Sequence, residues 1–166
     1  MSASPSVLLI CGVPGAGKST FCDWLVESLG YHRVDVDTNS DPAICGLLVP
    51  TAAGAEQLMV ALVACQPVVL DWGFPVIFLP LVDALMKLGV SGWWFDGDRK
   101  STNARYQRAK GSGPSSESLL LKQLGAISSV WPDIQAAFKG RTIDVLTQLG
   151  GDRTPEDIWA AMGGSA

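Results

Sequence analysis

The residues that most directly indicate chemistry are nine consecutive positions near the start of the chain. They match the phosphate-binding pattern G-x-x-x-x-G-K-[ST] and read Gly12, Val13, Pro14, Gly15, Ala16, Gly17, Lys18, Ser19 and Thr20. The glycines let the backbone turn so that successive N–H groups point at one anion, and the positive end of a following helix adds to the attraction. We therefore predict that this loop binds a nucleoside triphosphate. In that arrangement Lys18 reaches the β and γ phosphates, and the Ser19 hydroxyl ligates Mg²⁺.

The segments on either side of this loop have the patterns that such a loop requires. Val7–Cys11 is a continuous apolar run, which is typical of a parallel strand covered on both faces. The segment 19–29 repeats apolar residues at helical spacing and stops at Gly30. The alternative is a chance glycine-rich turn, but strand, loop and helix in this register favour a phosphate site.

Acidic residues follow each of the next three predicted strands, which span 31–36, 67–71 and 91–95. In parallel sheets, ligands gather at the carboxyl ends of the strands. These acids are therefore candidates for metal binding or proton transfer, and they are Asp35, Asp37, Asp71, Asp96 and Asp98.

Asp71 ends the apolar run Val68–Leu70, an arrangement in which the carboxylate holds Mg²⁺, often through water. The alternative is an aspartate that merely starts a turn. Trp72 follows it, where many ATP-driven motors carry a glutamate that activates water, so a motor is disfavoured. The chain has no Asn-Lys-x-Asp stretch that would select guanine, and we expect ATP as the phosphate donor.

Asp37 is the candidate general base. It lies two residues beyond Asp35 on an extended segment, so both side chains share one face and only the later one projects well past the strand end. A carboxylate there could take the proton of an attacking hydroxyl, which contributes about 10²- to 10⁴-fold in rate. Asp35 in the same role, or a turn formed by Asp37, Thr38 and Asn39, are the alternatives.

A charged helix is predicted over 98–110, followed by a flexible Gly-Ser connection over 111–116. We interpret 98–117 as a mobile lid. Arg105 and Arg108 lie three residues apart and so share a helix face, from which they could stabilise the charge of a transferring phosphoryl group. The alternative is a solvated basic surface.

The tryptophans leave two interpretations open. Trp93 and Trp94 are expected in the core on opposite faces of their strand, whereas Trp72 could belong to the core or to an apolar pocket for the phosphoryl acceptor. The segment 38–50 has no firm assignment and could also line that pocket.

The remaining pattern predicts helices alternating with strands. We expect a buried helix over 51–65, a helical segment over 75–88 interrupted at Pro80, a helix through Leu120–Ile127 and a short strand over 142–146. Thr154 and Pro155 predict the N-cap and first turn of a last helix. This alternation predicts an α/β fold with a parallel sheet between two layers of helices.

Composition sets the class of protein. With 166 residues, 48% hydrophobic content and a net charge of −4, we expect one domain over 1–166, no membrane span and no extended contact with nucleic acid. The apolar start leads directly into the phosphate loop, so removal as a signal peptide would destroy the site and a cytoplasmic location is expected. His32 is the only histidine, and we interpret the four cysteines as reduced packing residues: Cys11, Cys22, Cys45 and Cys65.

Four motifs in this order resemble those of the P-loop kinases: the phosphate loop, Val34–Thr38, Val68–Phe74 and Asn103–Arg108. The chain is most similar to the group that contains zeta-toxin kinases, chloramphenicol phosphotransferase and the kinase domain of polynucleotide kinases, which have an AAA-type ATP-binding domain.

The resemblance implies a five-stranded sheet of order 2-3-1-4-5 and transfer of the ATP γ phosphate to an acceptor hydroxyl. Asp37 then matches the catalytic aspartate and Arg105 the lid arginine, with Arg108 as a second one. The adenine-contacting loop would fall near 150–153. The resulting hypothesis is an ATP- and Mg²⁺-dependent kinase of a small molecule. A nucleotide-dependent switch and a 5′-hydroxyl nucleic-acid kinase are the alternatives.

Overall fold

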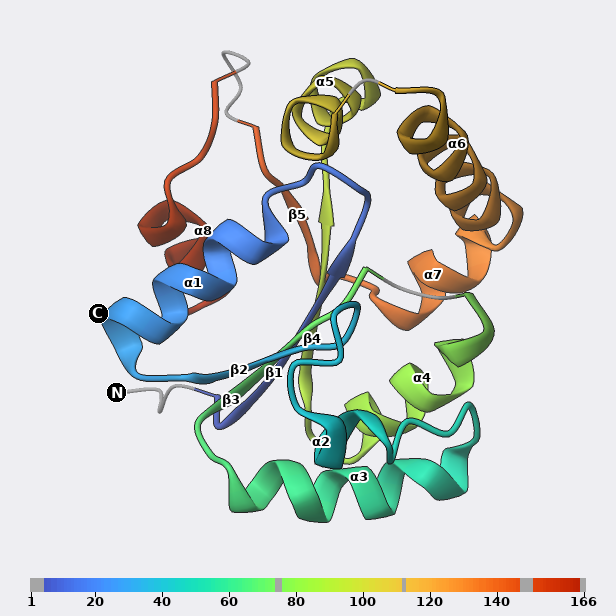
Figure 1. Ribbon diagram of the computed structural model, residues 1–166. Helices are drawn as coiled ribbons and strands as arrows, with labels where there is room; N and C mark the ends of the chain where they lie inside the picture. The colour runs from blue at the N-terminus through green and yellow to red at the C-terminus, as the bar shows by residue number, and fades with distance from the viewer. Residues whose placement is uncertain (1–4, 74–75, 112, 147–150, 165–166) are drawn as a thin grey trace.

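A single parallel sheet organises the part of the chain that the computed structural model describes, namely residues 5–73, 76–111, 113–146 and 151–164. Its strand order is β2-β3-β1-β4-β5, and every neighbouring pair is parallel (Figure 1). The strands are β1 Val7–Gly12, β2 His32–Asp35, β3 Val68–Asp71, β4 Ser91–Asp96 and β5 Thr142–Asp144. This order confirms the predicted three-layer α/β fold and its 2-3-1-4-5 sheet.

Helices cover both faces of the sheet. Figure 1 shows α1 and α8 on one side and α3, α4 and α7 on the other, while α5 and α6 lie beyond the carboxyl ends of the strands. The two short elements α2 and η1 complete the set. The bounds are α1 Lys18–Leu29, α2 Pro42–Cys45, α3 Ala52–Ala64, η1 Val76–Phe78, α4 Leu79–Lys87, α5 Arg99–Lys110, α6 Pro114–Ser129, α7 Trp131–Ala137 and α8 Pro155–Ala161.

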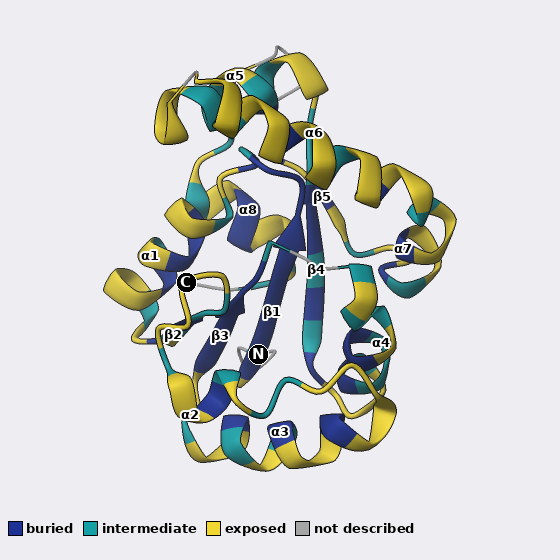
Figure 2. Cartoon of the chain, turned by 45° about the vertical axis from the view of Figure 1, so that its right-hand side comes forward, coloured by how far each residue is buried: buried dark blue, intermediate teal, exposed yellow. Residues whose placement is uncertain are grey.

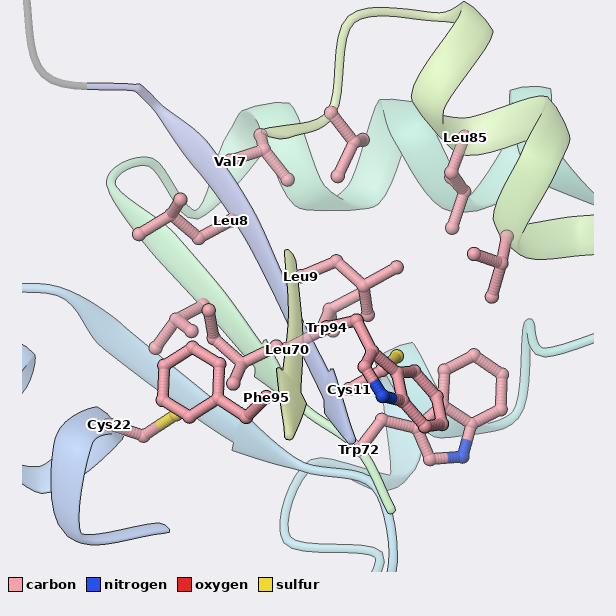
Figure 3. Close-up of a cluster of buried hydrophobic side chains, with 14 of the residues drawn as sticks. Val7, Leu8, Leu9, Cys11, Cys22, Leu70, Trp72, Leu85, Trp94 and Phe95 are labelled. Carbon is pink, nitrogen blue, oxygen red and sulfur yellow. The ribbon is translucent and has the colours of Figure 1, made fainter. Parts of the chain in front are cut away.

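The core lies along the central strands, which is why their sequences are apolar on both faces. All six residues of β1 and all four of β3 are buried, as the dark strands in Figure 2 show. Side chains from both helical layers meet these strands in the cluster of Figure 3. Cys11 and Cys22 belong to this core, and all four cysteines are free thiols.

Several helices begin or end at capping residues that can be recognised in the sequence. The Thr154 hydroxyl accepts a hydrogen bond from the Asp157 N–H, which confirms it as the N-cap of α8. Asp98 caps α5 through the Ser101 N–H. At the other end of α1, Gly30 has a φ of 70°, the left-handed conformation that closes many helices.

Two expectations about the helices were wrong. The helix over 51–65 was expected to be buried on all sides, yet the Val60 and Val63 residues of α3 are 74% and 48% exposed. An outer-layer helix has one face in solvent whatever its composition, and α3 is buried through Gly54, Ala55, Leu58 and Leu62.

The Gly-Ser connection over 111–116 is shorter than expected, because α6 already begins at Pro114. Proline is favoured in the first turn of a helix, where its missing N–H costs nothing. The sequence pattern also missed two elements, α2 and α7, both of which start with a proline in the first turn.

Candidate functional site

The phosphate loop joins β1 to α1, and its conformation leaves a row of N–H groups without protein partners. Gly12, Gly15 and Gly17 have φ values of 151°, 77° and 74°, which only glycine adopts at low cost. Among the described residues, no atom accepts a hydrogen bond from the backbone N–H groups at positions 15 and 17–20. Such N–H groups at the start of a 12-residue helix form an anion site.

The helix α5, which was predicted to belong to a lid, packs directly on this loop. A Cβ atom added to Gly15 would lie 1.9 Å from the Thr102 carbonyl oxygen and 3.1 Å from the Tyr106 nitrogen. Gly15 is therefore required for close approach as well as for its backbone conformation. The contact places α5 against the loop that is predicted to hold the phosphates.

Lys18 lies under the loop that it follows. Its ammonium group donates to the carbonyl oxygens of Gly12 at 3.2 Å and Val13 at 2.9 Å. Loss of solvent around this group lowers the pKa of Lys18, an effect that the nearby Asp71 opposes. Hydrogen bonds from an ammonium group to charged phosphate oxygens are stronger than those to neutral carbonyl oxygens, so we expect Lys18 to turn toward a bound phosphate.

Asp71 ends β3 and is only 4% exposed. Its Oδ2 atom accepts two hydrogen bonds from Arg33 on β2, from Nε at 3.1 Å and from a terminal nitrogen at 2.5 Å. The same guanidinium also contacts Asp23 at 2.5 Å and Asp35 at 3.3 Å. This network keeps a buried carboxylate paired without using its Oδ1 atom.

The oxygen donors at this position fit a magnesium ion. The Ser19 hydroxyl lies on the first turn of α1, and the Arg33 contacts leave Asp71 Oδ1 available in the described part of the chain. Mg²⁺ commonly takes one or two protein oxygens and completes its shell with phosphates and water. The described residues contain no group of three or more His, Cys, Asp or Glu side chains that could hold a metal by themselves.

Asp37 lies in the turn after β2 and reaches across to the residue that follows Trp72. Its Oδ2 atom accepts a hydrogen bond from the Gly73 N–H at 3.0 Å. Partial desolvation raises the pKa of Asp37, opposed by this hydrogen bond and by Lys18. The Asp35 carboxylate accepts hydrogen bonds from Arg33 and from the Thr38 N–H, which disfavours Asp35 as the general base.

The two arginines of the predicted lid lie in different surroundings. Arg105 forms an ion pair with Asp152, which lies in the segment expected to contact adenine. Arg108 is exposed and makes no hydrogen bond or ion pair with the described residues. Position 150 of that adenine segment lies outside the described residues.

Trp72 is 1% exposed and packs edge-on against Phe78, with ring centroids 5.1 Å apart. The structure thus favours the core interpretation of this residue. Trp94 is fully buried, whereas Trp93 is half-buried and donates to the Ser91 hydroxyl at 3.1 Å.

Sequence reasoning missed the partners of the candidate residues. Arg33, Gly73 and Asp152 were not singled out, yet they contact Asp71, Asp37 and Arg105 respectively. Only Arg33 had a usable signal, because it lies two residues before Asp35 and so shares its strand face. The other contacts join residues that are 36 and 47 positions apart.

Neither a protein-family model nor a curated protein sequence matches the chain. Solved structures do. A gluconokinase from Sinorhizobium meliloti 1021 aligns with a TM-score of 0.55 and 18% identity, covering 96% of this chain and 91% of its own. A shikimate kinase from Bacteroides thetaiotaomicron gives 0.53 and 15%, with coverages of 95% and 94%. The protein TT1252 from Thermus thermophilus gives 0.50 and 17%, with 96% of each chain covered.

These likenesses extend over nearly the whole of both chains. They support the broad resemblance drawn from the motifs and do not reach its narrower group of zeta-toxin, chloramphenicol and polynucleotide kinases. No helix in the described residues is long and apolar enough to cross a membrane. With the sheet order, the phosphate loop and these neighbours together, the chain has the fold of the P-loop kinases.

Proposed function

We propose that this protein is an ATP- and Mg²⁺-dependent kinase that transfers the γ phosphate to a hydroxyl group of a small molecule. The observation that carries the proposal is the row of unpaired N–H groups in the Gly12–Thr20 loop, with Asp37 and Asp71 at the same edge of the sheet. The two named kinases among the structural neighbours support it, as does the order of motifs shared with the zeta-toxin group.

Each candidate residue has a distinct role in this proposal. The Gly12–Thr20 loop holds the triphosphate, Lys18 bridges its β and γ phosphates, and Ser19 with Asp71 would hold Mg²⁺, which supplies charge neutralisation when it is bound. Arg105 leaves its ion pair with Asp152 and binds the equatorial oxygens of the transferring group, with Arg108 as a second candidate for this role.

Asp37 takes the proton of the acceptor hydroxyl. The hydroxyl oxygen forms a bond to the γ phosphorus, the bond between that phosphorus and the β,γ-bridging oxygen breaks, and ADP leaves with the electron pair. Desolvation raises the pKa of Asp37, which suits this role because it makes the carboxylate a stronger base than an ordinary aspartate.

The test combines binding with transfer. Calorimetry with ATP and Mg²⁺ should show binding by the wild type and at least a tenfold weaker binding by Lys18→Ala, a loss of about 1.4 kcal/mol. A screen of hydroxyl compounds for ADP release should give an acceptor whose turnover Asp37→Ala abolishes. Absence of ATP binding would refute the proposal, and slow hydrolysis unaffected by Asp37→Ala would favour the nucleotide-dependent switch.

A further inference from the structure

A cavity of about 430 Å³ is lined by residues from the start of α5, the second half of α6 and the start of α7. Its size falls within the range of about 300–1,000 Å³ that small-molecule sites occupy. Its wall consists of Arg99, Leu124, Ile127, Ser128 and Trp131. Nothing in the roles proposed above uses these five residues.

The wall is mainly apolar and is anchored to the core. Ile127 is 4% exposed, and the Trp131 ring packs edge-on against Trp94 with centroids 6.0 Å apart. Trp94 in turn packs against Phe138 at 5.7 Å. Such packing fixes the aromatic wall in place and preforms the cavity.

The positive charge of Arg99, the one charged side chain among the wall residues, is already paired with a carboxylate. Arg99 forms an ion pair with Asp96 and donates to the Gly97 carbonyl oxygen at 2.9 Å. A ligand in this cavity therefore meets an apolar surface, one hydroxyl from Ser128 and a neutralised guanidinium. Polar groups buried against such a wall without partners would cost free energy, which disfavours a polyol.

The cavity opens at the same edge of the sheet as the candidate base. Arg99 is tied to Asp96 at the end of β4, and Asp37 is tied to Gly73 just after β3. Both strands pair with β1, which leads into the phosphate loop. Two spacings of about 4.8 Å separate β3 from β4, so these strand ends lie about 10 Å apart across the loop.

The adenine end of the nucleotide is expected on a different side of α5. Asp152 lies in the segment expected to contact adenine, and it approaches α5 through Arg105 rather than through Arg99. Arg105 lies about one and a half helical turns beyond Arg99, some 9 Å along the axis. The cavity wall and the expected adenine contact therefore meet α5 at different points along the helix.

We propose that this cavity binds the apolar body of the phosphoryl acceptor. The proposal rests on the kinase function above and names its substrate class: a hydroxyl compound with an aromatic or alicyclic body. The hydroxyl lies at Asp37 and gives up its proton there as the bond to the γ phosphorus forms. The apolar body lies against Leu124, Ile127 and Trp131.

The experiment uses biphenyl-4-ylmethanol as the apolar probe and gluconate and shikimate as polar comparisons. Ser128→Trp fills the cavity from an exposed position of α6, so its risk to folding is small. Gln123→Trp adds the same bulk to an exposed position of the same helix that is not part of the cavity wall. Each variant is assayed for ADP release with each compound and for MgATP affinity by calorimetry.

We expect wild-type kcat/KM for the biphenyl alcohol to exceed that for the polar compounds by at least about tenfold, the scale on which apolar pockets discriminate. Ser128→Trp should lower kcat/KM for the biphenyl alcohol by a similar factor through a higher KM, whereas Gln123→Trp should leave kcat/KM unchanged. The affinity for MgATP should stay within about twofold of the wild type in both variants.

Preference for gluconate or shikimate in the wild type would overturn the cavity proposal and leave the kinase function standing. Equal losses in the two tryptophan variants would overturn it as well. If MgATP binds and the biphenyl alcohol is not phosphorylated, the cavity proposal falls, whereas the kinase function falls only if the wider screen of hydroxyl compounds gives no acceptor either.

Discussion

Arg33 and Asp71 form a paired carboxylate and guanidinium beneath the phosphate loop, with two hydrogen bonds to one oxygen at 3.1 and 2.5 Å. The arginine comes from β2 and the aspartate from the end of β3, which are neighbouring strands. Because Asp71 is 4% exposed, its charge would be costly without this partner. Arg33 thus supplies the opposite charge that pairs this buried carboxylate in the described part of the chain.

Replacing Arg33 with methionine should destabilise the fold. Asp71 would become an unpaired buried carboxylate, and breaking a buried pair from one side costs about 3 kcal/mol or more. The measurement is the midpoint of urea unfolding at unchanged slope. The double variant Arg33→Met with Asp71→Asn should recover much of the loss, and equal losses in the single and double variants would contradict the pairing argument.

Two glycines of the phosphate loop should differ in their response to alanine. Both Gly15 and Gly17 have φ near 75°, so alanine carries a backbone cost of about 1–2 kcal/mol at each. Only at Gly15 would the new Cβ meet backbone, 1.9 Å from the Thr102 oxygen, whereas nothing lies within 4 Å at Gly17.

We therefore expect Gly15→Ala to loosen α5 and Gly17→Ala to leave it in place. Hydrogen exchange of the α5 amides is the measurement, with faster exchange only in the Gly15 variant. Equal exchange in both variants would show that α5 does not pack on the loop as described.

Asp37→Asn should lower kcat by about 10²- to 10⁴-fold, because the amide cannot accept the acceptor proton. Since desolvation raises the pKa of Asp37 above the ordinary 3.8, the acidic limb of the wild-type pH profile should lie above that value. The measurement is kcat/KM against pH with an identified acceptor. A variant that keeps wild-type turnover would remove Asp37 from the base role.

Although Asp37→Asn should lower activity, it should raise the stability of the fold at neutral pH. A carboxyl with a raised folded pKa binds its proton more tightly in the folded state, so ionisation destabilises the fold as pH rises through that pKa. Asp37→Asn should therefore be more stable than the wild type at neutral pH, and the difference should vanish below the unfolded value near 3.8. Thermal unfolding across this pH range checks the sign.

Arg105 and Arg108 provide a matched pair on one helix. Arg105→Ala should reduce kcat by about 10³-fold if this residue reaches the transferring phosphoryl group, while Arg108→Ala should change it little. The reason is position: Arg105 lies between Thr102 and Tyr106, whose backbone contacts the loop, and Arg108 is exposed. Wild-type turnover in both variants would assign neither arginine to catalysis, and equally large losses in both would assign the role to the two together.

Releasing Arg105 from its surface partner should cost little stability. Asp152 is 72% exposed at its side chain, and exposed ion pairs contribute about 0–1 kcal/mol. Asp152→Asn should thus leave the unfolding midpoint nearly unchanged, with a small salt-dependent effect. A large loss would mean that this contact holds α5 closed.

The sequence alone was enough to predict the sheet and the loop. Apolar runs such as 7–11 and 68–70 reflect burial on both faces, and a parallel strand followed by the phosphate pattern and a helix has few other folds available. The resemblance to the P-loop kinases implied the strand order 2-3-1-4-5, which the structure confirms. The strands and the loop themselves are local features of the sequence.

Only the tertiary structure decided the contacts between distant segments. The pairs Arg33 with Asp71, Gly73 with Asp37 and Arg105 with Asp152 each join different elements, and no periodicity in one element encodes its partner in another. The exposure of the outer face of α3 and the cavity between α5, α6 and α7 are likewise set by how distant segments pack. The amino-acid pattern determines which face of a segment is apolar, whereas packing determines what that face meets.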